Sequence, residues 1–301
     1  MADDPDSGTV AAATQVRSIA LMVIASGLLT VNDAMVKWLT QSYPVGQVMS
    51  LRGVFVIAII VASAVVRGRT AELRVSNWRL QLTRGVLMSA STFLFVTALA
   101  LMPIADAIAI AFAGPVIATA LAAVILKEPV GWRRWSAIAV GFAGVVVMLR
   151  PAPDLIRVVA LVPLLAAVMG AFRDIVTRKM GTGGESTAAI MVVSTSVVTI
   201  AGLFSIPAGW APLAVADLGL YLASAMLIAL AQGLMIESLR LGEVALVAPF
   251  KYTSLVWAVL LGVMVWGDLP DSWTWIGSAL VVGSGLYIWH RELVLAKRRR
   301  E

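Results

Sequence analysis

The stretch ALALMPIADAIAIAFAGPVIATALAAVILKEPVGWRRWSAIAVGFAGVVVML (98–149) contains two long apolar runs separated by the polar segment KEPVGWRR (127–134). Each run comes close to the roughly 20 apolar residues that an α-helix needs to cross the hydrocarbon core of a bilayer. We therefore predict two membrane-spanning helices here, at about 104–126 and 132–150.

The rest of the chain repeats this pattern. Its 301 residues are 60% hydrophobic and only 13% charged, with a mean hydropathy of +0.93, whereas about a quarter of the residues of a soluble domain are charged. The sequence predicts an all-α integral membrane protein with ten transmembrane helices. They are expected at about 17–39, 44–66, 78–101, 104–126, 132–150, 157–179, 186–207, 215–239, 243–266 and 272–291.

Lysine and arginine alternate strongly between successive loops. Including Arg17 and the tail KRRR, sixteen of them lie in one set of loops and three, at Lys37, Arg150 and Arg157, in the other. Because basic residues collect on the cytoplasmic side, this predicts that both termini are cytoplasmic. The net charge of +6 therefore indicates membrane topology and not nucleic-acid binding.

The chain contains no cysteine and one histidine, His290. This excludes a disulfide framework, a thiol nucleophile and a metal centre with several histidines. There is also no HExxH pair and no nucleophile elbow. We expect no enzymatic activity, no cofactor and no bound metal. A sensor is disfavoured as well, because no loop is long enough to hold a folded domain.

An internal repeat links the two halves of the chain. NDAMVKWL (32–39) aligns with RDIVTRKM (173–180), which matches Asp33 with Asp174 and Lys37 with Arg178; Gly144 falls on Gly285 at the same offset. Five spans lie on either side of RPAPD. Five is odd, so the second copy crosses the membrane in the opposite sense, which is the architecture of secondary transporters. We expect a disordered cytoplasmic tail (1–16), a first repeat (17–150), a linker (151–156), a second, inverted repeat (157–292) and a basic cytoplasmic tail (293–301).

The stretch 98–149 resembles the signature repeat of the drug/metabolite transporter superfamily, EamA type. SLRLGEVALVAPFKYTSLVWAVLLGVMVWGDLPDSWTWIGSALVVGSGLYI (238–288) resembles its second copy, with Leu255 where a proline matching Pro115 is expected. The resemblance implies ten helices around a central cavity lined by helices 1, 3, 4, 6, 8 and 9. Among the bacterial members of this superfamily, the chain is similar to the aromatic-amino-acid exporters. Helix kinks are expected at Pro115 and Pro249.

Four ionisable residues are candidates for a gate or for ion coupling. Asp33 and Lys37 are spaced i, i+4 with the acid first, which favours a local ion pair. One interpretation is an interfacial pair whose lysine extends to the membrane surface. The other is functional, because Asp33 lies about 9 Å from the end of its span and ionisable groups at such depth usually serve transport. The matched Asp174 and Arg178 would then form the gate on the other side.

Candidates for the cavity wall are polar, aromatic or flexible side chains near the middle of the membrane. Packing is the alternative for each of them. For Lys251 we consider carboxylate binding against a structural role. Arg52 and Arg84 are read as structural, with Asp33 a plausible partner of Arg52. The glycine-rich runs GFAG and GSALVVGSG are expected to allow close helix packing. The cavity candidates are Ser89, Thr92, Phe93, Phe112, Met169, Lys251 and Trp257.

The functional prediction is a secondary transporter that exports amino acids or related small metabolites across the bacterial inner membrane by alternating access. Its partners would be the small-molecule substrate and the lipid bilayer, and the protein would be a monomer or a homodimer. The alternative is a carrier for uptake or exchange of larger anionic or nucleoside-like metabolites, which predicts a more basic cavity around Lys251 and Arg84.

Overall fold

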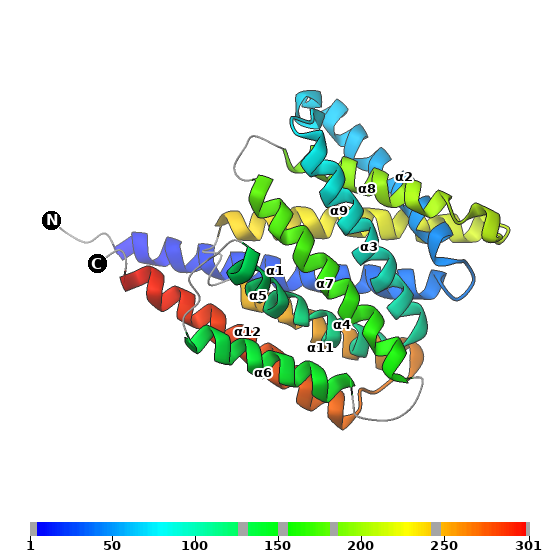
Figure 1. Ribbon diagram of the computed structural model, residues 1–301. Coiled ribbons are helices and arrows are strands. Elements are labelled where there is room, and N and C mark those ends of the chain that lie inside the picture. The colour runs from blue at the N-terminus through cyan, green and yellow to red at the C-terminus, as the bar shows by residue number, and fades with distance from the viewer. Residues whose placement is uncertain (1–4, 126–131, 150–155, 181–185, 242–247, 299–301) are drawn as a thin grey trace.

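The computed structural model describes residues 5–125, 132–149, 156–180, 186–241 and 248–298, and every regular element in these ranges is helical. The first half contains α1 (Pro5–Leu39), α2 (Val45–Val66), η1 (Thr70–Leu73), α3 (Trp78–Leu101), α4 (Ile104–Ala111), α5 (Ala113–Ile125) and α6 (Trp132–Leu149). The second half contains α7 (Ile156–Met180), α8 (Thr187–Leu203), η2 (Ile206–Ala208), α9 (Val215–Leu241), η3 (Ala248–Tyr252), α11 (Thr253–Leu261), the π-helical turn η4 (Gly262–Trp266) and α12 (Ser272–Arg298). The two termini lie at the same end of the bundle (Figure 1).

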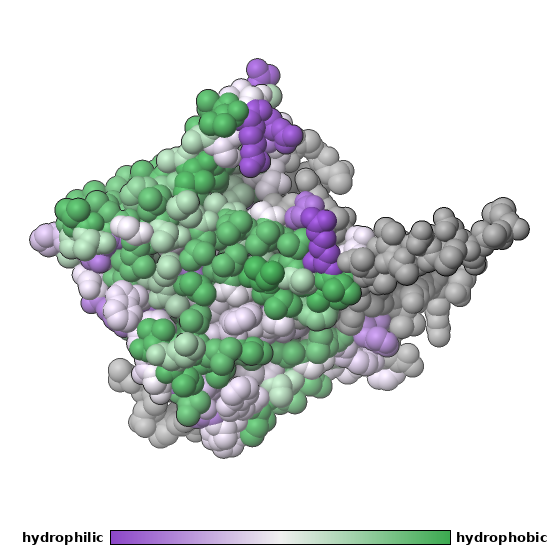
Figure 2. Space-filling view, turned by 180° about the vertical axis from the view of Figure 1, so that it is seen from behind, coloured by the Kyte–Doolittle hydropathy of each residue, from purple (hydrophilic) through white to green (hydrophobic). Residues whose placement is uncertain are grey.

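Within the described residues, six helices are long and apolar enough to cross a membrane, and three shorter apolar helical segments accompany them. Hydrophobic side chains cover most of the described surface in Figure 2, while hydrophilic groups gather near its edges. A soluble protein does not expose so large an apolar surface. The all-α membrane fold is confirmed.

The start of α1 corrects one expectation. The helix begins at Pro5, within the segment 1–16 for which we predicted a disordered tail. Proline is favoured at the first position of a helix, because its missing N–H has no partner there in any case. The run Ala11–Ala13 also has the highest helix propensity.

The fourth and ninth spans, predicted over 104–126 and 243–266, are interrupted close to Pro115 and Pro249, the two prolines at which kinks were expected. The fourth breaks at Phe112, between α4 and α5. Pro115 cannot donate to the Ala111 carbonyl, and its ring crowds that carbonyl. In the ninth span, Pro249 lies in the 3₁₀ turn η3 and a regular helix begins only at Thr253. Residues 242–247 lie outside the described residues.

The packing of the helices has the symmetry of an inverted repeat. In the repeat, α7 is the counterpart of α1, and α9 is the counterpart of α3. Exchanging counterparts turns the extensive α1–α9 contact into the similarly extensive α7–α3 contact. The pairs α2–α8 and α6–α12 map onto themselves, and the packing of α1 on η3 and α11 maps onto that of α7 on α4 and α5. Two inverted five-helix repeats therefore build one bundle.

Close packing of α6 on α12 uses the glycine-rich runs as predicted. A Cβ atom placed on Gly144 would lie 2.8 Å from the Gly277 carbonyl oxygen, and one on Gly141 would lie 2.7 Å from Ser284 Oγ. Small residues at such positions let helix backbones approach each other inside a membrane.

Candidate functional site

Two neighbouring cavities lie between the repeats. The α7 cavity, of about 390 Å³, is lined by Ser91, Phe95, Ala111, Gly114, Pro115, Ala166, Ala167, Gly170, Ala171, Arg173 and Asp174. The α1 cavity, of about 270 Å³, is lined by Ser26, Leu29, Thr30, Asp33, Phe95, Ile108, Ala111, Phe112, Met235, Lys251 and Ser254. Together they fall within the range of roughly 300–1,000 Å³ that is typical of small-molecule sites.

Phe95 and Ala111 line both cavities, so the two spaces adjoin at these side chains. The α7 cavity lies among the third, fourth and sixth spans. The counterparts of these spans in the repeat, the eighth, ninth and first, contribute to the α1 cavity, and each cavity contains one of the matched aspartates. The lining comes from spans 1, 3, 4, 6, 8 and 9, which is the set that the resemblance implied.

The α1 cavity contains one acidic and one basic side chain, Asp33 and Lys251. The interruption at η3 brings Lys251 to the cavity. Its turn is held in place by hydroxyl groups: Ser254 Oγ donates to the Lys251 carbonyl at 2.8 Å, and Thr30 on α1 donates to the Ser254 carbonyl at 3.5 Å. The two charges therefore come from opposite halves of the protein.

Asn32 connects Asp33 to the neighbouring helices. Its side chain, only 2% exposed, donates to Asp33 Oδ1 at 3.2 Å. Its Oδ1 accepts from Ser224 on α9 at 2.7 Å and from Arg52 on α2 at 3.5 Å. We expected Asp33 as the partner of Arg52. The two charges attract each other, but the hydrogen bond of Arg52 goes to Asn32.

Lys37 corrects the expectation of a local ion pair or of an exposed lysine. The side chain is 8% exposed, and its ammonium donates to the carbonyls of Leu99 at 2.8 Å and Met102 at 2.6 Å. These are unpaired carbonyls at the end of α3, where a cation also suits the helix dipole. Nζ further lies 5.4 Å from the centroid of the Trp266 ring. Lys37 thus binds the first, third and ninth spans together at the end of the bundle away from the termini.

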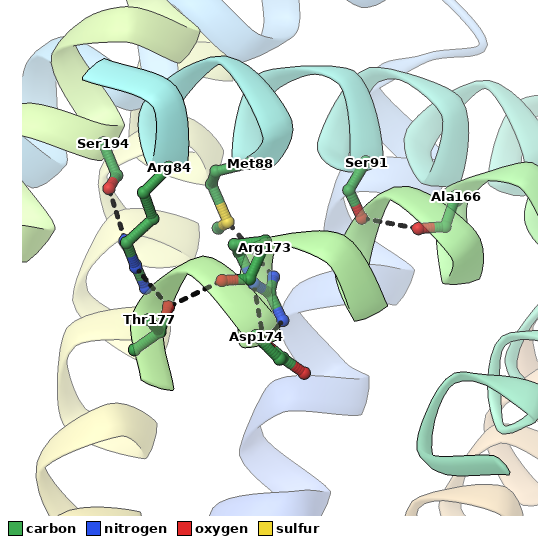
Figure 3. A network of polar contacts seen from close by, with 8 residues as sticks. All are labelled: Arg84, Met88, Ser91, Ala166, Arg173, Asp174, Thr177 and Ser194. Carbon is green, nitrogen blue, oxygen red and sulfur yellow. Dashed lines mark hydrogen bonds and ion pairs between the residues drawn. The ribbon is translucent and has the colours of Figure 1, made fainter. Parts of the chain in front are cut away.

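In the α7 cavity, Asp174 is held by the adjacent arginine. Arg173 donates to Asp174 Oδ1 from Nε at 3.0 Å and from Nη2 at 2.8 Å (Figure 3). Its Nη1 also contacts the sulfur of Met88 at 3.3 Å. On the facing wall, Ser91 Oγ donates to the Ala166 carbonyl at 2.9 Å and joins α3 to α7.

Arg84 is directed away from the cavities. Nε donates to Thr177 Oγ1 at 3.0 Å and Nη1 to Ser194 Oγ at 2.5 Å, so one guanidinium links α3, α7 and α8 (Figure 3). Arg178 belongs to α7, but its side chain lies outside the described residues.

Of the predicted cavity residues, Phe112 and Lys251 line the α1 cavity. Ser89, Thr92, Phe93, Met169 and Trp257 do not line either of the two cavities. Ser89 is 7% exposed, and Phe93 packs against the hydrophobic core. The ring of Trp257 covers Gly27 of α1, where a Cβ atom would lie 3.1 Å from it.

The choice of the wrong face of α3 explains most of these differences. Ser91 and Phe95, which line the α7 cavity, are spaced i, i+4 and share one face. Ser89 and Phe93 share another face, about 200° away around the helix at 3.6 residues per turn. Periodicity reveals such stripes but not which of them faces the cavity. Two of the cavity-lining residues that sequence reasoning missed are Arg173 and Ala111. Arg173 could have been found because it directly precedes Asp174, whereas the sequence contains no signal for Ala111.

Comparison with known proteins agrees with this architecture. Residues 16–150 match the EamA-like transporter family. The chain is 34% identical to a riboflavin transporter of Rhizobium johnstonii over 72% of this chain and 71% of that protein. It is 26% identical to an S-adenosylmethionine uptake transporter of Rickettsia prowazekii (87% and 89%) and 24% identical to a pseudopaline exporter of Pseudomonas aeruginosa (88% and 93%).

A solved crystal structure shares the fold. It superposes with a TM-score of 0.60 at 19% sequence identity, and the match covers 91% of this chain and 96% of the other. Sequence and fold thus point in the same direction as the inverted halves and the cavities between them. The protein is a multi-pass membrane transporter that belongs to the EamA-like family of the drug/metabolite transporter superfamily.

Proposed function

We propose that the protein is a secondary carrier that exports amino acids or related small zwitterionic metabolites across the bacterial inner membrane. The observation that supports this most directly is the α1 cavity, where Asp33 and Lys251 line the same space. A zwitterion carries one group complementary to each. The aromatic rings of Phe95 and Phe112 offer an apolar surface for a side chain.

Alternating access would arise from movement of one repeat against the other. The matched residues Asp33 and Asp174 lie in the two cavities, and Lys37 links three spans at the end away from the termini. In this proposal the Lys37 contacts close that end, while Arg178 has the corresponding role at the opposite end in the other conformation. Asp33 and Asp174 are proposed as coupling or gate residues.

Flux into proteoliposomes tests the transport proposal. We expect counterflow of at least one labelled amino acid, because the cavity has the size and the charges for it. Transport of another metabolite, with no flux of any amino acid, would rule the substrate class out. If transport is coupled to protons, a pH gradient should drive it, and Asp33→Asn should abolish the effect of the gradient while leaving downhill exchange.

A second candidate is a carrier for a larger, nucleoside-like metabolite. The relatives named for riboflavin and S-adenosylmethionine favour it, and so do the rings around the cavities. Its expected basic cavity is present only in part, since Lys251 lines a cavity but Arg84 binds Thr177 and Ser194 instead. Flux of labelled riboflavin in the same liposomes distinguishes this candidate from the first.

The orientation is proposed from the loop charges, sixteen basic residues against three, with both termini cytoplasmic. Reporter fusions test it. A fluorescent protein fused to the C-terminus should fold and fluoresce, while a periplasmic alkaline phosphatase fused there should stay inactive. An active phosphatase and a non-fluorescent reporter would place the C-terminus in the periplasm. The Lys37 end of the bundle would then face the cytoplasm.

A further inference from the structure

Lys251 differs from the other basic side chains that the structure describes inside the spans. Lys37 donates to two carbonyls, Arg84 to two hydroxyls, Arg52 to Asn32 and Arg173 to Asp174. For Lys251, no side-chain hydrogen bond or ion pair is formed with any residue in the described ranges. Its ammonium instead borders the α1 cavity.

A lysine in this position has three donors and a full charge to satisfy. The Lys251 side chain is exposed in the structure, but a charge within a membrane span is away from bulk water, and such charges are normally paired because their desolvation is costly. Ionisable groups within membrane spans therefore tend to mark substrate pathways. The Asp174 carboxylate acts on the charge of Lys251 but forms no hydrogen bond with it in the described residues, so the three donors of Lys251 are open to a group on the ligand.

We infer that Lys251 binds the carboxylate of a zwitterionic substrate and thereby selects for it, with Asp33 binding the ammonium group of the same molecule. The inference rests on the proposed function and names the substrate group that this cavity recognises. Asp33 suits its role because its one described side-chain hydrogen bond comes from the neutral amide of Asn32. The Arg52 cation attracts its charge from a distance, but no direct ion pair occupies the carboxylate in the described residues.

The charges around the cavities favour a carboxylate over a phosphate. A phosphate carries close to two negative charges and would need a second free cation. Other described cations in the spans already have partners: Arg173 holds Asp174, Arg84 binds Thr177 and Ser194, and Arg52 binds Asn32. One lysine and one aspartate in the wall of the same cavity match a ligand with one charge of each sign.

The cation also breaks the symmetry of the repeat. At the offset of 140 residues that matches Pro115 with Leu255, the counterpart of Lys251 is Ala111, which lines both cavities without a charge. The second half alone therefore supplies an anchor for the anionic group. If this position served packing alone, there would be no reason for a charged side chain at Lys251 and a methyl group at Ala111.

The test compares ligands that differ only in the carboxylate. Thermal stability of the purified full-length protein is measured with each of the twenty amino acids and with its carboxamide, since a ligand that binds the folded state raises the melting temperature. We expect at least one amino acid to stabilise the wild type and its amide not to. Lys251→Gln should weaken binding of that amino acid by about 10- to 100-fold, which is the strength of a hydrogen bond to a charged group. Lys251→Arg should retain much of it.

Arg84→Gln is the matched control, because it removes a cation inside another membrane span, α3, that lines neither cavity. This variant should lower the melting temperature without ligand but keep the preference for acid over amide. Lys251→Gln removes no side-chain hydrogen bond to any residue that the structure describes, so we expect it to fold, and size-exclusion chromatography checks this. If it does not fold, the comparison is made with Lys251→Arg and Lys251→Met.

Three results would overturn the inference. The first is that Lys251→Gln still prefers the amino acid to its amide. The second is that riboflavin is the one ligand that binds, with the same affinity for wild type and variant. The third is that the wild type binds no amino acid. Proteoliposome flux separates this failure from that of the proposed function. If riboflavin flux is the same in wild type and Lys251→Gln, the protein is a carrier, but Lys251 does not select its substrate. If the wild type transports none of the probes, the proposed transport of these compounds is wrong.

Discussion

Phe112 and Tyr252 meet ring to ring, edge on face, with 5.0 Å between their centroids. They are 140 residues apart and occupy equivalent positions in the two repeats. Each lies where its span is interrupted, at the end of α4 and at the end of η3. Residues related by a two-fold exchange can touch each other only near the axis, so this pair marks the point about which the halves are related.

The first prediction concerns the coupling across this axis. An edge-to-face pair contributes about 0.5–1.5 kcal/mol beyond the area it buries. A double-mutant cycle with Phe112→Leu and Tyr252→Leu should therefore give a coupling energy of that size, measured by unfolding in detergent. Strictly additive effects would show that the rings touch without stabilising the contact between the halves.

The second prediction concerns closure at the Lys37 end. Lys37→Met removes both hydrogen bonds to the end of α3 and the contact with Trp266, so the cavities should open towards the side away from the termini. Because the chain has no cysteine, Ser254→Cys is a single reporter in the α1 cavity. Its labelling by a membrane-impermeant thiol reagent added from that side should accelerate in the Lys37→Met background. Lys37→Arg is the control and should label slowly, and equal rates in all backgrounds would contradict the proposed closure.

The third prediction concerns the contact between α2 and α8. A Cβ atom on Gly202 would lie 2.5 Å from the Gly46 carbonyl oxygen, which belongs to the backbone and cannot rotate away. Gly202→Ala should therefore destabilise the protein by about 1–3 kcal/mol, as overpacking does. Gly219→Ala in α9 is the matched control, because nothing lies within 4 Å of its Cβ position, and it should be neutral or slightly stabilising. Similar melting temperatures for the two variants would argue against close packing at Gly202.

The fourth prediction concerns Arg84. Arg84→Leu leaves the hydroxyls of Thr177 and Ser194 without their donor, and hydrogen bonds to charged groups contribute about 1.5–3 kcal/mol each. The melting temperature should fall clearly, while the substrate range stays the same because Arg84 lines neither cavity. A variant of normal stability with an altered substrate range would instead place Arg84 in the basic cavity of the second candidate function.

Several features of the site could be predicted from the sequence because they depend on spacing along the chain. The repeat offset matched Asp33 with Asp174, and each lies in one of the two cavities. Pro115 anticipated an interruption, since a proline inside a helix disturbs the preceding turn. The composition of α3 predicted a mixed polar and apolar face, but the choice between Ser89–Phe93 and Ser91–Phe95 depended on how the helix is rotated against α7.

Membrane insertion, the alternation of basic loops and the inverted repeat of the two halves can all be derived from the amino-acid sequence. These properties follow from hydrophobic length, charge distribution and an odd number of spans, all of which are local or additive along the chain. The partners of each charge, in contrast, depend on how the helices pack. Lys37 and Asp33 are four residues apart, yet Lys37 binds carbonyls at residues 99 and 102, and Lys251 meets a cavity whose other wall is α1. Inside a membrane a charge takes the nearest polar group in space, and that group is fixed by helix packing.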